Sequence, residues 1–300
     1  MLAEQSLNNK IQNKMHKELD FIKMNGAGND FVIIDARKKT IELLPNDCKD
    51  ICDREFGIGC DQLVIIEESA NFDCYMSIYN QDGSTAEACG NATRCVASLL
   101  FEENLSLSKV IIETIVGALE CFKEPNSMIA VKMGKVKFGW QDIPLAIEQN
   151  TQGFDLLGQK IYCANIGNPH AVIFVDQKVH DNEIYNLGPQ IENYTLFPKK
   201  TNVEFAQITS EMHISARVWE RGVGETKACG SGACAIAAIA IKNKLVKSEK
   251  VMISYPGGDI IIDWNGDMDR PLVMTGDCEK EFQGHICFDI HNKINFNFKK

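Results

Sequence analysis

The feature that most constrains the fold of this chain is an internal repeat in which matching residues recur at nearly one spacing. A Gly-Asn turn leads into a β-branched segment at Asn29 and again at Asn168, 139 positions later. An Ala-Cys-Gly sequence contains Cys89 and, 140 positions later, Cys229. Because unrelated segments do not hold several landmarks at a constant spacing, the repeat predicts two copies of one architecture.

The spacing of 140 also carries Gln62 onto Asn202 and Asn80 onto Glu220. Each of these polar residues stands next to a segment rich in β-branched and aromatic residues. Such segments, most of them bounded by Gly, Asn, Asp or Pro, predict strands. In the first half they are 31–35, 63–67, 75–79, 110–114, 118–123 and 128–136. In the second half they are 160–164, 171–175, 203–208, 212–219, 251–255 and 259–263.

Each half also contains one segment with helical periodicity, and it begins directly after the cysteine. Apolar residues follow Gly90 at the i, i+3, i+4 spacing, and the segment after Gly230 is apolar nearly all round. A helix without a polar face must be buried, so we expect it in the middle of its sheet. The polar stretch 139–158 is the best boundary between the halves. Residues 1–20 form an extension, and 284–298 alternates like a strand that returns to the first half.

Composition narrows the classes of function. The net charge of −10 at pH 7 disfavours a nucleic-acid or anionic-membrane partner. No apolar run of about 20 residues predicts a membrane span, and the polar start has no secretory core. The 12 cysteines contain no C-x-x-C, which argues against zinc-ribbon and thioredoxin-like sites. We therefore expect a soluble cytoplasmic protein with reduced thiols.

Cysteines placed just before helix starts suggest a specific chemistry. Free N–H groups and the helix dipole are expected to lower the pKa of Cys89 and Cys229 and to hold a carboxylate. Asn91 and Ser231 are expected to cap the helices. If both helix starts face one cleft, one sulfur lies on each side of an amino-acid α-carbon. A thiolate would then remove the α-proton and a thiol would return one to the opposite face. No bound dinucleotide is expected, since the glycine-rich loops 26–28 and 222–224 lack the dinucleotide fingerprint. No metal is expected either, since C-x-x-C is absent and the chain has only six histidines.

From Phe21 onward the sequence resembles the diaminopimelate epimerase family. The motifs that carry the resemblance are residues 24–31, 57–62, 80–95, 167–170, 202–203, 220–226, 228–235 and 256–258. The resemblance implies an α/β (α+β) fold with two pseudo-symmetric lobes, each a curled, mostly antiparallel sheet around a central helix. The lobes would be 21–140, joined by the C-terminal strand 284–300, and 141–283. It also implies a homodimer that interconverts LL- and meso-2,6-diaminopimelate, in bacterial lysine and peptidoglycan synthesis, without a cofactor.

The resemblance further implies a role for individual residues. Cys89 and Cys229 would be the acid and base thiols, and His170 and Glu220 would adjust their pKa. The residues that would bind substrate are Asn29, Gln62, Asn80, Gly90, Asn91, Asn168, Asn202, Glu220, Arg221, Gly230 and Ser231. Arg221 has no charged counterpart in the first half, where Gln81 takes its place. This asymmetry fits a substrate whose second carboxylate is held at one end only.

Two positions depart from the family pattern. Ala92 stands where the family usually has Gly, and Asp277 follows Thr275-Gly276 where the family tends to have Pro. Two other functions remain open from the residues alone. One is a related two-cysteine racemase acting on proline or hydroxyproline, and the other is a non-enzymatic redox or metal-binding protein.

Overall fold

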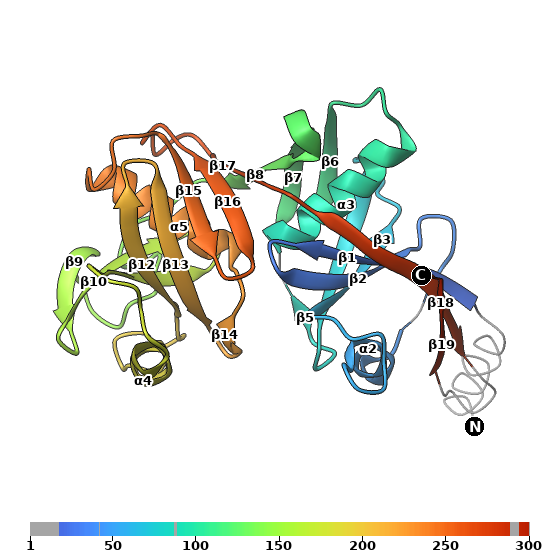
Figure 1. Cartoon of the computed structure of the whole chain (residues 1–300), viewed down its shortest axis with the longest axis horizontal. Coiled ribbons are helices and arrows are strands. Elements are labelled where there is room, and N and C mark those ends of the chain that lie inside the picture. The colour runs from blue at the N-terminus through green and yellow to red at the C-terminus, as the bar shows by residue number, and fades with distance from the viewer. Residues whose placement is uncertain (1–17, 42, 87–88, 289–293, 300) are drawn as a thin grey trace.

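The computed structural model describes residues 18–41, 43–86, 89–288 and 294–299, which form two bodies lying side by side (Figure 1). The fold is mixed α/β and consists mostly of strands. The elements of the first body are β1 (Glu18–Gly26), β2 (Asn29–Asp35), α2 (Pro45–Cys52), β3 (Gln62–Glu67), β4 (Cys74–Asn80), β5 (Thr85–Ala86), α3 (Gly90–Glu103), β6 (Lys109–Thr114), β7 (Gly117–Lys123), the 3-10 turn η1 (Pro125–Ser127), β8 (Ile129–Gly134), β18 (Glu279–Phe288) and β19 (Ile294–Lys299). The elements of the second body are β9 (Gln152–Leu156), β10 (Gln159–Asn165), β11 (Pro169–Phe174), α4 (Asp181–Glu192), β12 (Asn202–Ser210), β13 (His213–Glu220), β14 (Gly224–Thr226), α5 (Gly230–Lys242), β15 (Lys250–Tyr255), β16 (Gly258–Asp263) and β17 (Leu272–Gly276).

The order of strand pairings in the first body recurs in the second. β2 is parallel to β3, β3 antiparallel to β4, and β4 parallel to β6. In the second body β11 is parallel to β12, β12 antiparallel to β13, and β13 parallel to β15. The register recurs as well, since Phe31 lies opposite Gln62 and His170 lies opposite Asn202. The constant spacing in the sequence therefore coincides with one pairing pattern formed twice.

A helix begins directly after each cysteine of the repeat, as predicted. Eleven of the 14 residues of α3 and ten of the 13 residues of α5 are buried. α3 contacts β1, β2, β6, β7 and β8, and α5 contacts β10, β11, β12, β15, β16 and β17. A helix with so little polar surface is stable only when strands cover it on most sides, and each body provides that cover.

The end of the chain crosses from the second body back to the first (Figure 1). β17 pairs with β8 and β16, whereas β18 pairs with β1 along its length. Two expected boundaries need correction. β1 begins at Glu18, so the last three residues of the expected extension 1–20 belong to the sheet, and residues 1–17 lie outside the described residues. β18 begins at Glu279, so 279–283 pair with the first body and not with the second.

The segment expected as one strand over 284–298 forms parts of two antiparallel strands, β18 and β19. Its residues 289–293 lie outside the described residues. Helices α2 and α4 were not predicted, and both lie between a parallel pair of strands. α2 is only eight residues long, and α4 contains Pro189 after Gly188, where a Cβ would lie 2.8 Å from Trp219. Short length and breaker residues concealed both helices from a periodicity search.

The two bodies touch through a pair of glycine loops. Gly28, in the turn between β1 and β2, has a φ of +85°, and a Cβ there would lie 2.4 Å from the Cα of Gly257. Gly257 lies in the turn between β15 and β16, and its N–H donates to the carbonyl of Lys227 at 2.9 Å. The contact therefore joins the β1–β2 turn of one body to the residues that precede Cys229 in the other.

We expect Gly28→Ala to destabilise the protein more than a matched glycine substitution elsewhere. Gly158 also has a positive φ, +74°, but nothing lies within 4 Å of the position of its Cβ. Gly158→Ala should lower the free energy of unfolding by about 1 kcal/mol through backbone strain alone. Gly28→Ala should lose about 1–3 kcal/mol more because the backbones must separate. Urea unfolding of both variants measures the difference, and equal losses would show that the loop contact contributes nothing.

Candidate active site

Cys89 and Cys229 are the N-cap residues of α3 and α5, in extended conformations that are nearly the same in φ and ψ. The Cys229 sulfur accepts from the N–H of Gly232 at 3.4 Å and lies 3.5 Å from the Ser231 hydroxyl. The expectation that Asn91 and Ser231 cap the helices is wrong. Both lie inside the first turn, because the cysteine itself holds the cap position at which the chain leaves its extended conformation.

The two helix starts meet. A Cβ on Gly230 would lie 3.2 Å from Oδ1 of Asn91, although one residue belongs to α5 and the other to α3. Positions for a Cβ on Gly90 and on Gly230 both fall within 3 Å of the Met274 side chain. The free N–H groups of both first turns are thus brought to one place, each next to its cysteine. Ala92, the departure from the family pattern, is fully buried within the first turn of α3, so its methyl group is accommodated.

Burial reverses the expected direction of the thiol pKa values. It raises the pKa of Cys89 to about 11, although the backbone N–H groups of Ala92 and Asn91 lower it. It also raises the pKa of Cys229 well above the usual value, and the charges of Glu220 and Glu204 add to the rise. The helix starts therefore act as predicted, but the loss of water around the sulfur outweighs them. Burial therefore favours the thiol form of both residues.

Polar residues of the first body form a chain of hydrogen bonds beside Cys89. The amide of Asn91 donates to Oδ1 of Asn29 at 2.6 Å, and Asn29 donates to Asp61 at 3.2 Å. On the neighbouring strands, Nε2 of Gln62 donates to Oδ1 of Asn80 at 3.0 Å. These contacts place the predicted residues at the ends of β2, β3 and β4 on the side where α3 begins. They hold the amide groups in fixed orientations.

The matching residues of the second body are more deeply buried. His170 is fully buried, with Nδ1 2.6 Å from Glu204 and Nε2 2.8 Å from Oδ1 of Asn168. Asn202 donates to the carbonyl of Pro169 at 2.9 Å, and its Oδ1 accepts from the backbone N–H of Arg221 at 2.9 Å. Asn202 therefore fixes the backbone from which the Arg221 side chain extends.

Glu220 links the two bodies electrostatically. Burial raises its pKa, and the charges of Glu204 and Asp61 raise it further, while a hydrogen bond from Thr226 and the charge of His170 lower it. Its own charge raises the pKa of both Cys89 and Cys229. Glu220 is thus the carboxylate that acts on both thiols. Arg221 is exposed and forms no ion pair with any residue that the structure describes.

We expect Glu220→Gln to lower the pKa of both thiols, because removing a nearby negative charge favours the thiolate. The pH at which Cys89 and Cys229 become reactive to iodoacetamide should fall in the variant. Peptide mass spectrometry across a pH series measures both midpoints without substrate. Glu211→Gln, which removes an exposed carboxylate from the β12–β13 turn, is the control and should leave them unchanged. Midpoints that stay in place or rise in Glu220→Gln would contradict the assignment.

Three buried polar residues near the site were not predicted. Glu204 lies under His170, and Tyr255 lies near it, since a Cβ on Gly232 would be 2.9 Å from Oε1 of Glu204 and 3.0 Å from the Tyr255 hydroxyl. Arg94 is fully buried in α3 and donates to Oδ1 of Asn91 at 2.8 Å. A charged residue within an apolar strand or helix was the available signal for Glu204 and Arg94.

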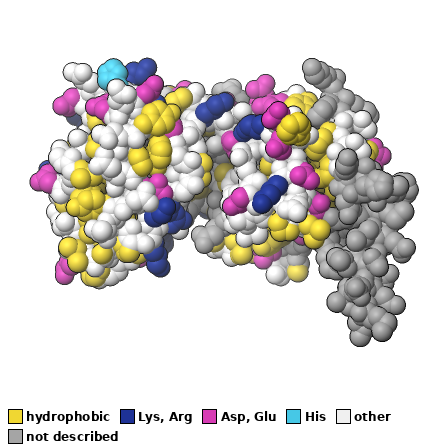
Figure 2. All heavy atoms as spheres, turned by 90° about the horizontal axis from the view of Figure 1, so that it is seen from below, with side chains coloured by type: hydrophobic (Ala, Val, Ile, Leu, Met, Phe, Trp, Pro, Cys, Tyr) yellow, Lys and Arg dark blue, Asp and Glu magenta, His cyan; other side chains and the backbone are white. Residues whose placement is uncertain are grey.

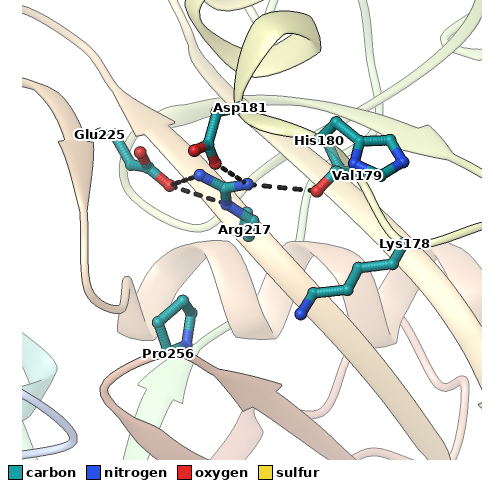
Figure 3. A pocket seen from close by; sticks show the side chains of 7 residues that line it. All are labelled: Lys178, Val179, His180, Asp181, Arg217, Glu225 and Pro256. Carbon is teal, nitrogen blue, oxygen red and sulfur yellow. Dashed lines mark hydrogen bonds and ion pairs between the residues drawn. The ribbon is translucent and has the colours of Figure 1, made fainter.

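A separate hollow lies on the second body, lined by Lys178, Val179, His180, Asp181, Arg217, Glu225 and Pro256 (Figure 3). Arg217 crosses it and bonds to Glu225 at 2.6 Å, to Asp181 at 2.8 Å and to the carbonyl of Val179. Two carboxylates thus compensate its charge. The contact with Glu225 fixes β14, whose Thr226 donates to Glu220. Neither Cys89 nor Cys229 lines the hollow.

The surface carries charges of both signs, as expected for a chain with 31 Lys and Arg residues and 41 Asp and Glu residues. Figure 2 shows acidic and basic side chains interspersed over both bodies on one face. No helix in the described ranges has the length and apolar character needed to cross a membrane. Among the same residues, no group of three or more His, Cys, Asp or Glu side chains is placed to hold a metal ion.

Comparison with known proteins identifies the family. The family model described as "Diaminopimelate epimerase" matches residues 21–139 and 162–281. A relative from Sphingopyxis alaskensis, named "Diaminopimelate epimerase", is 43% identical over 267 residues, which are 88% of this chain and 96% of the relative. A phenazine biosynthesis protein of the PhzF family from Bacillus anthracis has a TM-score of 0.65 at 15% identity, covering 90% of this chain and 99% of the other. A hydroxyproline epimerase from Agrobacterium vitis has a TM-score of 0.64 at 12% identity, covering 91% and 93%. These structures share the fold, whereas the sequence matches carry the assignment: the chain belongs to the diaminopimelate epimerase family.

Proposed function

We propose that this protein interconverts LL- and meso-2,6-diaminopimelate by removing and returning the proton of one α-carbon. The observation that carries the proposal is the meeting of two helix starts, each capped by a cysteine, around Asn91 and Met274. Membership in the family supplies the substrate. In this arrangement Cys89 and Cys229 are the acid and base, and the reaction needs neither a cofactor nor a metal.

The reacting end of the substrate binds at the two helix starts. Its carboxylate accepts from N–H groups of Gly90 and Asn91 on α3 and of Gly230 and Ser231 on α5. These donors face the carboxylate as negative charge spreads onto it from the α-carbon, so they stabilise the carbanion. The two cysteines directly precede these helix starts and come from different bodies. One sulfur therefore faces each side of the carbon.

Substrate binding supplies the charge that converts one thiol to the base. In the unliganded protein, burial and Glu220 both disfavour the thiolate. An ammonium group of the substrate placed beside Glu220 would cancel the effect of this carboxylate on the sulfurs. The base thiol gives its proton to solvent water as the substrate binds, which leaves the thiolate. The opposite cysteine remains a thiol and returns a proton to the other face.

The distal end of the substrate explains the polar residues that the thiol chemistry does not use. Its carboxylate fits the guanidinium of Arg221, which forms no ion pair within the described part of the chain. Its ammonium has three N–H donors, for which Glu220 and the amide oxygens of Asn29, Gln62, Asn80, Asn168 and Asn202 are the candidate acceptors. His170, held between Glu204 and Asn168, positions the Asn168 amide and adjusts the charge near Glu220.

Incubation with LL-diaminopimelate in deuterated water tests the function. We expect one deuterium to enter at an α-carbon as the meso isomer appears, and no exchange into proline or hydroxyproline. Exchange into proline alone would make the protein a racemase for substrates with one carboxylate. Stoichiometric zinc in reductively purified protein without any exchange would favour the metal-binding alternative.

We further propose that the two bodies are pseudo-symmetric lobes, each a curled, mostly antiparallel sheet around its central helix, and that the enzyme works as a cytoplasmic homodimer. The repeated pairing pattern supports the lobes. Size-exclusion chromatography with light scattering measures the oligomeric state, and a monomer of 33.5 kDa would contradict the dimer.

A further inference from the structure

A second pair of cysteines lies where the chain crosses between the two bodies. Asp277 and Cys278 are the only residues between β17 and β18. Cys278 is half-buried, between the exposed residues Asp277 and Glu279, so solvent reaches this crossover. Cys278 also lies against α3 of the first body, because its sulfur is 3.8 Å from the carbonyl oxygen of Arg94.

The partner thiol of Cys278 is Cys95, one turn and a half into α3. The sulfur of Cys278 lies 3.8 Å from the carbonyl oxygen of Arg94, the residue before Cys95, and Cys95 has the largest effect on the pKa of Cys278. Cys95 is fully buried, and a Cβ on Gly26 of β1 would lie 3.4 Å from its sulfur. Cys278 is therefore partly exposed, whereas Cys95 is enclosed. Neither residue has a role in the proton transfers proposed for Cys89 and Cys229.

A buried positive charge stands beside this pair. Arg94 is fully buried, its Nη2 has no hydrogen-bond partner, and no carboxylate pairs with it among the residues that the structure describes. Its Nε donates to the carbonyl of Asp277 at 3.3 Å. Interaction with Cys95 lowers the pKa of Cys278 to about 7, and Ser98 and Arg94 lower it as well, against the effect of burial. A guanidinium without a carboxylate is best compensated by a thiolate at this position.

We propose that Cys278 and Cys95 form a site of oxidation by hydroperoxides, which closes to a disulfide between the β17–β18 crossover and α3. The thiolate of Cys278 attacks the peroxide, so an S–O bond forms while the O–O bond breaks, and the leaving oxygen takes a proton to become water or an alcohol. The thiol of Cys95 then attacks the sulfenic sulfur, and the S–S bond forms as water leaves with the remaining proton. The two thiols lose two electrons, and the peroxide gains them.

The disulfide would tie the crossover to the helix that begins at Cys89. β17 pairs with β16 of the second body and with β8 of the first, and β18 pairs with β1, so the crosslink would add a covalent tie at the crossover where the two bodies are joined. A second pair of thiols provides an internal comparison. The sulfurs of Cys52 and Cys60 are 3.4 Å apart, but both residues are buried. The hydrogen bond with Cys52 and then burial raise the pKa of Cys60 well above its usual value. Proximity without solvent access should not suffice.

The test treats the reduced full-length protein with hydrogen peroxide, alkylates the remaining thiols and identifies linked peptides by mass spectrometry. We expect the peptide joining Cys95 to Cys278 to form on the order of ten times faster than one joining Cys52 to Cys60. In Cys95→Ser, Cys278 should accumulate as sulfenic and sulfinic acid, since no second thiol resolves it. Recovery of Cys278 as a free thiol after Cys89 and Cys229 have oxidised would overturn the proposal, as would equal over-oxidation in wild type and Cys95→Ser.

Alkylation kinetics give an independent measurement that needs no oxidant. At pH 7, a thiol of pKa about 7 is half ionised, whereas an ordinary thiol of pKa about 8.5 is about 3% ionised. Lower nucleophilicity offsets part of this gain, so iodoacetamide should modify Cys278 about threefold faster than the half-buried Cys287 of β18. Cys278 reacting no faster than Cys287 would contradict the thiolate on which the site depends.

Discussion

Replacing either Cys89 or Cys229 by alanine is expected to lower the rate of epimerisation by about 10²- to 10⁴-fold, the usual contribution of one positioned acid or base. Each variant should nevertheless keep exchange of the α-proton with deuterated water for one isomer of the substrate. The remaining thiolate still faces one side of the carbon, and it exchanges only the hydrogen that points toward it. The two variants should therefore retain exchange in opposite isomers. Deuterium incorporation into LL- and meso-diaminopimelate, followed separately, measures this.

This result would also assign the cysteines to the two faces of the carbon. Cys287→Ala, which removes a thiol from β18 far along the chain, is the matched control and should leave the rate unchanged. Near wild-type epimerisation by either active-site variant would contradict the mechanism with two bases. Retention of exchange in the same isomer by both variants would place the two sulfurs on one side of the substrate.

Replacing Arg221 by glutamine is expected to lower kcat/KM for diaminopimelate by at least about 10²-fold. Two charge-assisted hydrogen bonds to a carboxylate contribute about 1.5–3 kcal/mol each, and about 1.4 kcal/mol corresponds to a factor of ten. Arg221→Lys keeps the charge but loses the fork of donors, so it should recover only part of the activity. Steady-state kinetics of the three proteins measure the loss.

Lysine isolates the contact between Arg221 and the distal carboxylate, because lysine is diaminopimelate without that carboxylate. The wild-type protein should exchange the α-proton of lysine far more slowly than that of diaminopimelate. Arg221→Gln should lose little further activity on lysine, since the partner of the guanidinium is already absent. The two substrates and two proteins form a cycle whose non-additivity is the interaction energy. An equal loss on both substrates would mean that Arg221 acts elsewhere than on the distal carboxylate.

The sequence predicted the parts of the structure that depend on the repeat. The helices begin after Cys89 and Cys229 because each cysteine ends an extended segment just before an apolar helical period. The predicted strands recur with the same spacing because Phe31 and His170 occupy equivalent register positions opposite Gln62 and Asn202. Asn29 begins β2 and Asn168 directly precedes β11, so their placement beside the site followed from the repeat.

Features that depend on packing between distant segments could not be read from the sequence. The pairing of Glu18–Asp20 with β18 joins residues more than 250 positions apart, and local polarity made the segment look like an extension. The thiol pKa values rise because burial is a property of the assembled bodies, whereas the helix starts that lower them are local. Glu204 was missed for the same reason, since its role comes from contact with His170 across two neighbouring strands.

The central claim is that both sulfurs address one carbon from opposite sides. A crystal structure of the protein with diaminopimelate bound tests it most directly. The account predicts each sulfur about 3–3.5 Å from the same α-carbon, on opposite faces, with the adjacent carboxylate against the N–H groups of both helix starts. A complex in which the substrate contacts only one of Cys89 and Cys229, or meets both on one face, would contradict it.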